Sequence, residues 1–229
     1  MQKFFITATG TGIGKTLVTT SLCHQLNMAG RKVSAIKPVI SGYDPFDKVN
    51  DTALILDSLG MDATAENIEK ISPWRFAAPL SPDMAAKNEG KKIDLSEVVD
   101  FCKSWEKLAL DILLVEGAGG VCVPLNDKNT TLDLIDQLGF KIILVTGTYL
   151  GTISHTLTAF NTLAARGIPV HALIINESEN STVSLAQTRD SIANFVPKET
   201  VIITVPRQTY TDNNKKLWEN IPDISKVCS

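Results

Sequence analysis

Residues 9 to 16, which read TGTGIGKT, are the part of this 229-residue chain whose composition and spacing point most directly to chemistry. Glycines at alternate positions let backbone N–H groups surround an anion without interference from a Cβ atom. A lysine placed like Lys15 can reach the β- and γ-phosphates of a nucleotide, and a hydroxyl placed like that of Thr16 can bind Mg²⁺. The segment therefore predicts a phosphate-binding loop, or P-loop.

The match to the strict P-loop pattern is incomplete, because that pattern has a glycine where this chain has Thr9. An apolar run before the loop and helical spacing after it still place Gly-Lys-Thr between a strand and a helix, whose N-terminus adds positive potential. The residues expected to bind the nucleotide phosphates are Gly12, Ile13, Gly14, Lys15 and Thr16.

Charged residues also follow two other apolar runs. Glu116 comes after the run 112–115 and precedes the residues GAGG, which allow a ligand to approach the backbone closely. A carboxylate at such a strand end, beside the P-loop, predicts a second contact to the metal of a nucleotide. Lys37 follows the run 33–36, and its ammonium predicts a second positive charge against a transferred phosphate.

Two more polar residues have competing interpretations. Asn176 ends the run 170–175, and its amide offers the donor and the acceptor that match N6 and N7 of adenine; a turn-forming asparagine is the alternative. The residues after it lack the lysine of the N-K-x-D guanine motif, so GTP is disfavoured. Asp51, taken alone, fits the N-cap of the helix expected after it better than it fits a metal ligand.

Strand-like and helix-like segments alternate along the chain and would carry these residues. The apolar runs are continuous, which is typical of parallel strands buried on both faces. Strands are expected at 4–7, 33–36, 112–115, 141–145, 170–175 and 200–205, and helices at 18–29, 94–108 and 153–164. This order predicts an α/β chain with three layers and a mainly parallel central sheet. Ligands bind at the carboxyl ends of such strands, so we expect the polar residues, Pro206 included, to meet at one edge.

The composition limits the other possibilities. Hydrophobic residues make up 44% of the chain, and 22 Lys and Arg stand against 25 Asp and Glu with no basic block, which argues against a nucleic-acid partner. No apolar run is long enough for a membrane span, and no C-x-x-C pair occurs, so we expect a cytoplasmic protein with reduced thiols. Residues 1–229 are expected to form a single domain, in which 38–93 supply loops and short helices.

Seven segments together resemble the dethiobiotin synthetase family. They are residues 9–16, 37–42 (KPVISG), 50–51, 79–82 (PLSP), 115–120 (VEGAGG), 150–155 (LGTISH) and Asn176. The family usually has Gly and Asp where this chain has Ala8 and Gly10. The resemblance implies a P-loop nucleoside triphosphatase fold and an ATP- and Mg²⁺-dependent ligase, which adds CO₂ to 7,8-diaminononanoate and closes a ring through a phosphorylated carbamate.

The resemblance also implies roles for individual residues. Lys15 and Lys37 would be catalytic, Asn176 would bind the adenine base, and Pro206 would also contact the nucleotide. The implied metal ligands are Thr16, Asp51 and Glu116, of which Glu116 also contacts the nucleotide. The implied substrate-binding residues are Thr11, Lys37, Ser41, Gly151, Thr152, Ile153 and Ser154. In this family the segment 151–154 comes from the second subunit of a homodimer.

Two alternatives keep the same fold. Partition and positioning ATPases are switches that carry an extra lysine early in the loop, where this chain has Gly10, and often a basic amphipathic C-terminal helix, whereas the charges of residues 210–229 are mixed. A glutamine-dependent amidoligase would need a further domain, for which no chain remains. The choice among ATP, CTP and GTP stays open, as does the identity of the general base.

Overall fold

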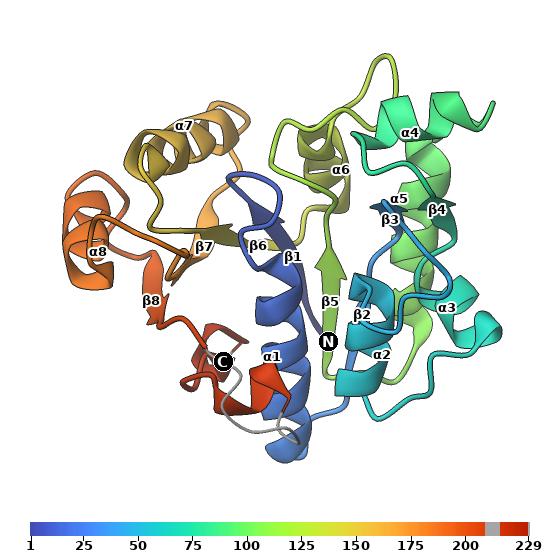
Figure 1. Ribbon diagram of the computed structural model, residues 1–229, viewed down its shortest axis with the longest axis horizontal. Helices are drawn as coiled ribbons and strands as arrows, with labels where there is room; N and C mark the ends of the chain where they lie inside the picture. The colour runs from blue at the N-terminus through green and yellow to red at the C-terminus, as the bar shows by residue number, and fades with distance from the viewer. Residues whose placement is uncertain (209–215, 229) are drawn as a thin grey trace.

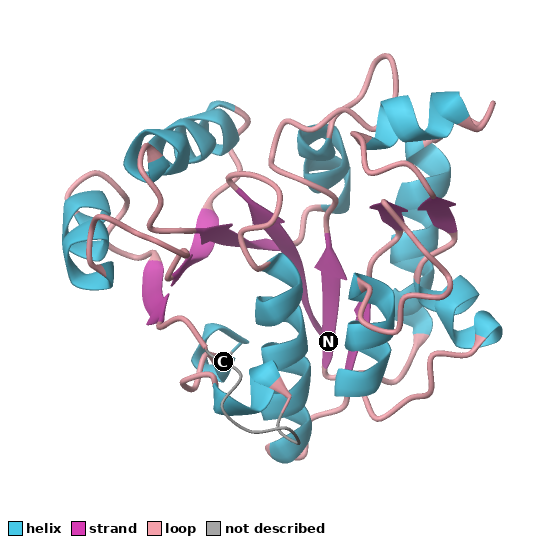
Figure 2. Cartoon of the chain, viewed as in Figure 1, coloured by secondary structure: helices cyan, strands magenta, loops and turns pink. Residues whose placement is uncertain are grey.

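The structure is a computed structural model that describes residues 1–208 and 216–228. Its centre is a six-stranded sheet with the order β2-β5-β1-β6-β7-β8, in which every pairing is parallel (Figure 2). The strands of this sheet are β1 (Gln2–Ala8), β2 (Val33–Ile36), β5 (Ile112–Glu116), β6 (Lys141–Thr146), β7 (Val170–Asn176) and β8 (Val201–Val205). The expected parallel sheet is confirmed.

The aliphatic runs form strands because both faces of the sheet are covered. Phe5, for example, is fully buried and pairs with Val115 on one side and Ile142 on the other. Such strands exclude water from both faces, so nearly every side chain along them contributes apolar burial. Because β1 lies between β5 and β6, the loop that follows β1 emerges at the middle of the carboxyl edge.

Helices cover both faces of the sheet (Figure 1). α1 lies on one face and contacts α2 and the two C-terminal 3-10 helices, whereas α5 and α6 pack on each other on the opposite face. This division follows from right-handed crossovers that leave β1 in one direction and β5 in the other. The helices are α1 (Lys15–Met28), α2 (Asp51–Ser58), α3 (Ala65–Ile71), α4 (Pro82–Asn88), α5 (Leu95–Ser104), α6 (Thr131–Leu138), α7 (Thr152–Ala165) and α8 (Leu185–Ala193), with 3-10 helices at Trp105–Lys107, Leu217–Asn220 and Ser225–Cys228.

The expectation for residues 38–93 was incomplete. This region contains three short helices, α2, α3 and α4, as expected. It also contains two short strands, β3 (Val39–Ser41) and β4 (Trp74–Phe76), which pair in parallel and form a second sheet. Strands of three residues beside prolines lack a recognisable hydrophobic period, so the sequence does not reveal them. The small sheet positions Ser41, because β3 brings this residue toward the carboxyl edge of the main sheet.

The C-terminal segment that was weighed against a switch ATPase, residues 210–229, lies partly outside the described residues. Its described part, 216–228, forms two 3-10 helices that pack against α1. Across the two described ranges, none of the helices has the length and apolar character that crossing a membrane requires.

Candidate active site

The P-loop connects the end of β1 to the start of α1. Gly12 and Gly14 both have positive φ, at 72° and 93°, and Gly14 is the N-cap of α1. A Cβ atom on Gly14 would lie 2.4 Å from the side-chain nitrogen of Asn176, so two separate constraints require glycine there. Lys15 is the first residue of α1, and its Nζ donates a 3.3 Å hydrogen bond to the carbonyl oxygen of Gly10.

The two residues that differ from the family pattern, Ala8 and Gly10, lie at backbone positions that any residue can adopt. Ala8 is the last residue of β1, and neither Ala8 nor Gly10 has a positive φ. The carbonyl oxygen of Ala8 accepts the N–H of Val121 at 3.1 Å. A Cβ atom on Gly120 would lie 3.2 Å from that oxygen, so the glycines after β5 allow two backbone segments to pack closely.

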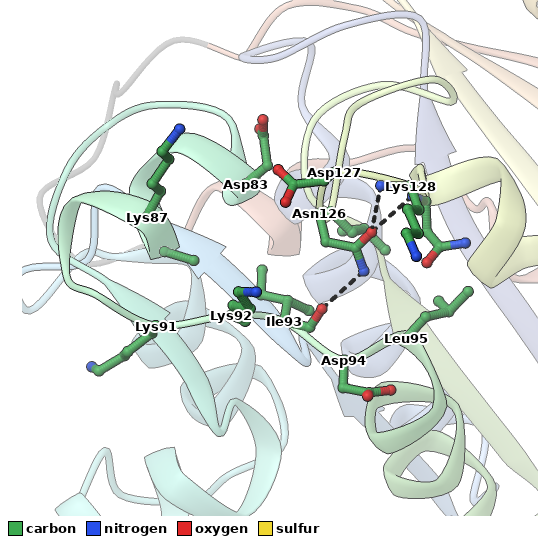
Figure 3. Close-up of a pocket in the computed structure, with 13 residues that line it drawn as sticks. Asp83, Lys87, Lys91, Lys92, Ile93, Asp94, Leu95, Asn126, Asp127 and Lys128 are labelled. Atoms are coloured by element: carbon green, nitrogen blue, oxygen red, sulfur yellow. Dashed lines mark hydrogen bonds between the residues drawn. The ribbon is translucent and has the colours of Figure 1, made fainter.

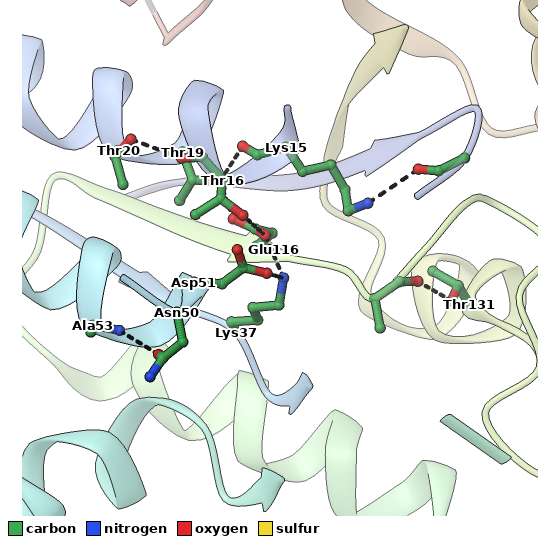
Figure 4. A network of polar contacts seen from close by, with 12 residues as sticks. Lys15, Thr16, Thr19, Thr20, Lys37, Asn50, Asp51, Ala53, Glu116 and Thr131 are labelled. Atoms are coloured by element: carbon green, nitrogen blue, oxygen red, sulfur yellow. Dashed lines mark hydrogen bonds and ion pairs between the residues drawn. The ribbon is translucent and has the colours of Figure 1, made fainter. Parts of the chain in front are cut away.

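A buried charge cluster lies below the P-loop (Figure 4). The Glu116 carboxylate is 0% exposed, and its Oε1 accepts hydrogen bonds from Lys37 Nζ at 2.6 Å and Thr16 Oγ1 at 2.9 Å. Its Oε2 accepts from Thr19 Oγ1 at 2.6 Å. Lys37, whose side chain is 5% exposed, also reaches Asp51 Oδ2 at 2.5 Å. Residues of β5, α2 and the end of β2 therefore meet at one ammonium group, and α1 joins the cluster through Glu116.

The surroundings change the proton affinities of three of these groups. Burial, followed by the charge of Lys37, lowers the pKa of Lys15 to about 8. Burial also acts to lower the pKa of Lys37, but the charges of Glu116 and Asp51 outweigh it and hold that pKa above the value of a free lysine. For Asp51, burial acts to raise the pKa, but Lys37 outweighs it and keeps the pKa low. Lys37 and Asp51 therefore remain a charged pair.

The N-cap prediction for Asp51 was wrong. The N-cap of α2 is Asn50, whose Oδ1 accepts the N–H of Ala53 at 2.9 Å. Asp51 is the first helical residue, and its carboxylate turns toward Lys37 (Figure 4). Both residue types cap helices well, so propensity alone does not decide between neighbours. A distant partner sets the direction of the Asp51 carboxylate, because Lys37 comes from the end of β2.

Thr19 is a site residue that the sequence interpretation missed. It is fully buried in α1, and it lies three residues after Thr16. Residues with that spacing share a face of a helix, and both hydroxyls reach Glu116. The helical spacing of two threonines after a P-loop lysine was therefore the signal that could have identified it.

The cluster has the composition of a Mg²⁺ site. Thr16, Asp51 and Glu116 offer one hydroxyl and two carboxylates around a single cationic position. Mg²⁺ prefers oxygen ligands, and in nucleotide sites it usually takes one or two carboxylates together with phosphate oxygens. No group of three or more His, Cys, Asp and Glu residues that could hold a metal occurs in the described ranges. The donor set thus fits a metal that phosphates help to bind.

A cavity of about 720 Å³ opens above this cluster. The predicted site residues that line it are Thr11, Gly12, Gly14, Lys15, Thr16, Lys37, Ser41 and Asp51. The segment 79–82, which carries part of the family resemblance, forms another wall. The fold therefore brings both predicted catalytic residues, Lys15 and Lys37, together with Thr11 and Ser41, although these come from two different strand ends.

A second cavity, of about 420 Å³, lies on the other side of Gly12 and Gly14 and is also lined by Ile13, Asn176 and Pro206. Asn176 Nδ2 donates to the carbonyl oxygen of Ile13 at 2.8 Å, whereas its buried Oδ1 has no hydrogen-bond partner. The two cavities share the P-loop glycines, so a nucleotide could place its phosphates toward the first cavity and its base toward the second.

The segment 151–154 lines neither cavity. Gly151 is the N-cap of α7 with φ of 94°, and no side chain caps this helix end. Leu150, just before it, is 86% exposed. The segment is still tied to the P-loop of its own chain, because the Tyr149 hydroxyl lies 3.4 Å from Thr9 Oγ1 and 3.0 Å from His155 Nδ1.

A further cavity, of about 460 Å³, lies apart from these residues between α4, the segment 91–95 and the loop 125–129 (Figure 3). Asn126 is its central polar side chain, and its amide is already used: Nδ2 donates to the carbonyl oxygen of Ile93, and Oδ1 accepts two backbone N–H groups. None of the predicted site residues lines this cavity.

Comparison with known proteins agrees with the architecture and the motifs. The family described as an AAA domain matches residues 2–215. Among solved structures, the cell division protein MinD of Aquifex aeolicus superposes with a TM-score of 0.56 at 16% identity, covering 91% of this chain and 83% of that chain. FtsY of Mycoplasma mycoides gives a TM-score of 0.55 at 14% identity, covering 99% of this chain and 66% of that chain. These structures show a shared P-loop fold.

Curated relatives are much closer in sequence. The ATP-dependent dethiobiotin synthetase BioD of Acidiphilium cryptum (strain JF-5) is 43% identical over 84% of this chain and 87% of its own length. The protein of the same name from Caulobacter sp. (strain K31) is 45% identical over 86% of this chain and 84% of its own length. With this identity over most of both lengths, and with a P-loop, a buried Glu116–Lys37 pair and Asn176 at the expected places, the chain belongs to the ATP-dependent dethiobiotin synthetase family.

Proposed function

We propose that this protein makes dethiobiotin from 7,8-diaminononanoate, CO₂ and ATP, with Mg²⁺ as the metal. The observation that carries the proposal is one cavity lined by a P-loop and by Lys15, Lys37 and Ser41, in a chain 43% identical to a dethiobiotin synthetase. Its volume of about 720 Å³ is in the usual range for a site that takes a small molecule.

The proposed reaction has three steps. One amine of the diamino acid adds to the carbon of CO₂ and loses a proton, which forms a carbamate. A carbamate oxygen then takes the γ-phosphoryl group of ATP as the bond to ADP breaks. The second amine attacks the same carbon, phosphate leaves with the C–O bond, a second proton is lost, and the ureido ring closes.

Such a reaction needs positioning and charge neutralisation more than covalent help from the protein. Lys15 would neutralise the β- and γ-phosphates, and Lys37 the transferring phosphoryl group and the carbamate. Thr11 and Ser41 would hold the carbamate or the diamine. Mg²⁺, bound by Thr16, Asp51 and Glu116, would withdraw charge from the phosphate oxygens.

In the second cavity, Asn176 and Pro206 would bind the base. The free Oδ1 of Asn176 can accept a hydrogen bond from an exocyclic amine, because its Nδ2 is held by the P-loop carbonyl of Ile13. This polarity supports a base with an exocyclic amine, such as adenine, and it does not separate adenine from cytosine or guanine, which carry such an amine as well.

The proposal predicts that ATP hydrolysis depends on the second substrate, because water is a poor phosphoryl acceptor in a site arranged for a carbamate. Phosphate release should be measured with Mg²⁺ and ATP alone, and again after adding the diamine and bicarbonate. A large increase supports the synthetase. Equal rates would favour a switch ATPase, the alternative that shares this fold.

We also propose a C₂ homodimer in which residues 151–154 of each subunit bind the carboxylate of the substrate held at the partner's P-loop. Two observations support it: this segment lies outside the cavities of its own chain, and no side chain caps the start of α7. Unpaired N–H groups and the positive end of a helix suit a carboxylate.

A complementation experiment tests the shared site. Lys15→Ala disables the P-loop, and Gly151→Val disables the α7 segment because valine is strained at a φ of 94°. Lys15→Ala should be inactive alone, Gly151→Val should be impaired when the diamine is kept below the concentration that saturates the wild type, and mixed dimers should regain one intact site. Absence of recovered activity, with mixed dimers confirmed by native mass spectrometry, would show that the sites are not shared in this way.

A further inference from the structure

The Lys37 ammonium lies among the oxygen atoms that the proposed function assigns to Mg²⁺. Its Nζ is 2.6 Å from Glu116 Oε1 and 2.5 Å from Asp51 Oδ2 (Figure 4). Thr16 Oγ1 donates to the same Oε1 of Glu116 at 2.9 Å. All three proposed metal ligands therefore contact Lys37 or share an acceptor atom with it.

A lysine and a divalent cation would compete for these oxygens. The side chains of Lys37 and Glu116 are 5% and 0% exposed, so water does little to screen charges between them. Two cations bound to one carboxylate oxygen at contact distance would repel each other strongly. One of them has to leave, and the lysine is the one with a flexible four-carbon chain.

We propose that Lys37 is an internal cation that holds Glu116 and Asp51 in the nucleotide-free protein, and that it releases them when Mg²⁺ and nucleotide bind, so that its ammonium turns into the cavity. The inference rests on the proposed function, which assigns the metal to these ligands. Its consequence is coupling: Lys37 becomes available to the reacting groups only when the metal is in place.

The rest of the cluster is arranged for such an exchange. Thr19 Oγ1 holds Oε2 of Glu116 at 2.6 Å from the buried side, so this carboxylate can keep its orientation when Lys37 leaves. The cavity that Lys37 lines is also lined by Lys15 and Ser41, which gives the released ammonium a polar destination next to the P-loop. The exchange therefore requires one side chain to change its rotamer.

Cation binding without nucleotide tests the proposal directly. Isothermal titration calorimetry with Mg²⁺, and with Mn²⁺ as a second probe, should be carried out on the wild-type protein and on Lys37→Met, which keeps the length of the side chain but removes its charge. The variant should bind the cation about tenfold more tightly or better, since an opposite charge at contact distance changes the proton affinity of a carboxylate by at least that factor. Equal or weaker binding would overturn the proposal.

Lys128→Met is the matched control. Lys128 is exposed in the loop 125–129, outside the cluster, so the control loses the same charge without freeing a carboxylate. Its affinity for the cation should equal that of the wild type. A similar gain in both variants would mean that net charge, and not the position of Lys37, sets the affinity, and that result would also overturn the proposal.

Two measurements remain decisive if Lys37→Met folds poorly. The cation should raise the melting temperature of this variant more than that of the wild type, and an equal rise would contradict the exchange. In the wild type, the lysine side-chain NMR signal assigned to Lys37 through Lys37→Arg should shift with Mg²⁺ and a non-hydrolysable ATP analogue together. An unchanged signal would show that Lys37 stays with its carboxylates.

These experiments use no diamine and detect no product. They can fail while dethiobiotin is still formed, in which case only the exchange is wrong. They can also succeed in a protein that makes no dethiobiotin, in which case the proposed reaction is wrong and the cation exchange stands.

Discussion

The charge cluster at Lys37 and the start of α7 are both proposed to bind charged parts of the substrates, yet they are built in opposite ways. In the cluster, Glu116 is buried and three donors from the same chain satisfy its two oxygens. At α7, Gly151 and Ser154 are exposed, and no side chain caps the helix. The cluster is complete within one chain, whereas at the helix end the only N–H with a partner inside the described part of the chain, among those of residues 152–154, is that of Thr152, which bonds to the carbonyl oxygen of Tyr149.

Because the two regions differ in burial, mutations in them should have different effects on folding stability and on substrate binding. A buried ion pair is costly to break, because removal of one partner leaves the other charge without compensation in a medium that solvates it poorly. An exposed helix end has little to lose on mutation, since water already satisfies its groups. Changes in the cluster should therefore affect folding and metal binding, and changes at α7 should affect only the substrate.

The largest expected effect is on folding. Glu116→Gln removes the charge opposite Lys37 while Asp51 remains, and it should lower the free energy of unfolding by about 3 kcal/mol, the lower end of the range for breaking a buried pair. Urea unfolding measures this loss.

Glu106→Gln is the control, because the Lys3–Glu106 pair has a similar distance, 2.9 Å, but both side chains are 32% exposed. It should cost under about 1 kcal/mol, and a comparable loss in both variants would remove the distinction between the regions.

The next effect is a pH dependence in the nucleotide-free protein. The pKa of Lys15 is about 8 in the folded chain and 10.5 in the unfolded chain. Below pH 8 the charged lysine therefore opposes folding, and this cost disappears as pH rises from 8 to 10.5. Lys15→Met should be more stable than the wild type at pH 7, by roughly 3 kcal/mol at most. The advantage should shrink toward pH 10.5, and a pH-independent difference would contradict the lowered pKa.

A smaller effect concerns the orientation of Glu116. Thr19→Val removes the hydroxyl that holds Oε2, so the Mg²⁺ concentration needed for half-maximal activity should rise about tenfold, as is usual when the support of a metal ligand is lost. Thr19→Ser should restore the Mg²⁺ dependence of the wild type.

Thr20→Val is the control, because Thr20 is equally buried in α1 but donates only to the carbonyl oxygens of Thr16 and Leu17. An equal change in Thr19→Val and Thr20→Val would indicate a general disturbance of α1.

The smallest effect tests the other region. The methyl ester of the diamino acid lacks the negative charge that residues 151–154 are proposed to bind. It should bind several-fold more weakly than the acid, which corresponds to about 1 kcal/mol for a charge at a helix N-terminus. Equilibrium binding of both compounds gives the ratio. Identical affinities would mean that the carboxylate does not contact a charged or polar site.

The sequence predicted well whatever depends on local pattern. The six parallel strands, the P-loop and the position of Glu116 at the end of β5 follow from continuous aliphatic runs and from glycines next to Lys15. The pairing of β3 with β4 could not be predicted, because three residues carry no reliable period. The N-cap role that propensity favoured for Asp51 was wrong, because its partner Lys37 lies 14 residues away, and only the family resemblance pointed to the site. The role of Thr19 was missed because Glu116 lies 97 residues away, although the spacing of Thr16 and Thr19 places both on one helix face.

The proposed function requires this chain to form the ureido ring of dethiobiotin. The most direct measurement is mass spectrometry of a reaction that contains the purified protein, ATP, Mg²⁺, bicarbonate and 7,8-diaminononanoate. We expect a product heavier than the diamine by one carbonyl group and lighter by two hydrogens, which appears only when ATP is present. If the diamine is recovered unchanged while the protein is folded and binds ATP, the proposed function is wrong.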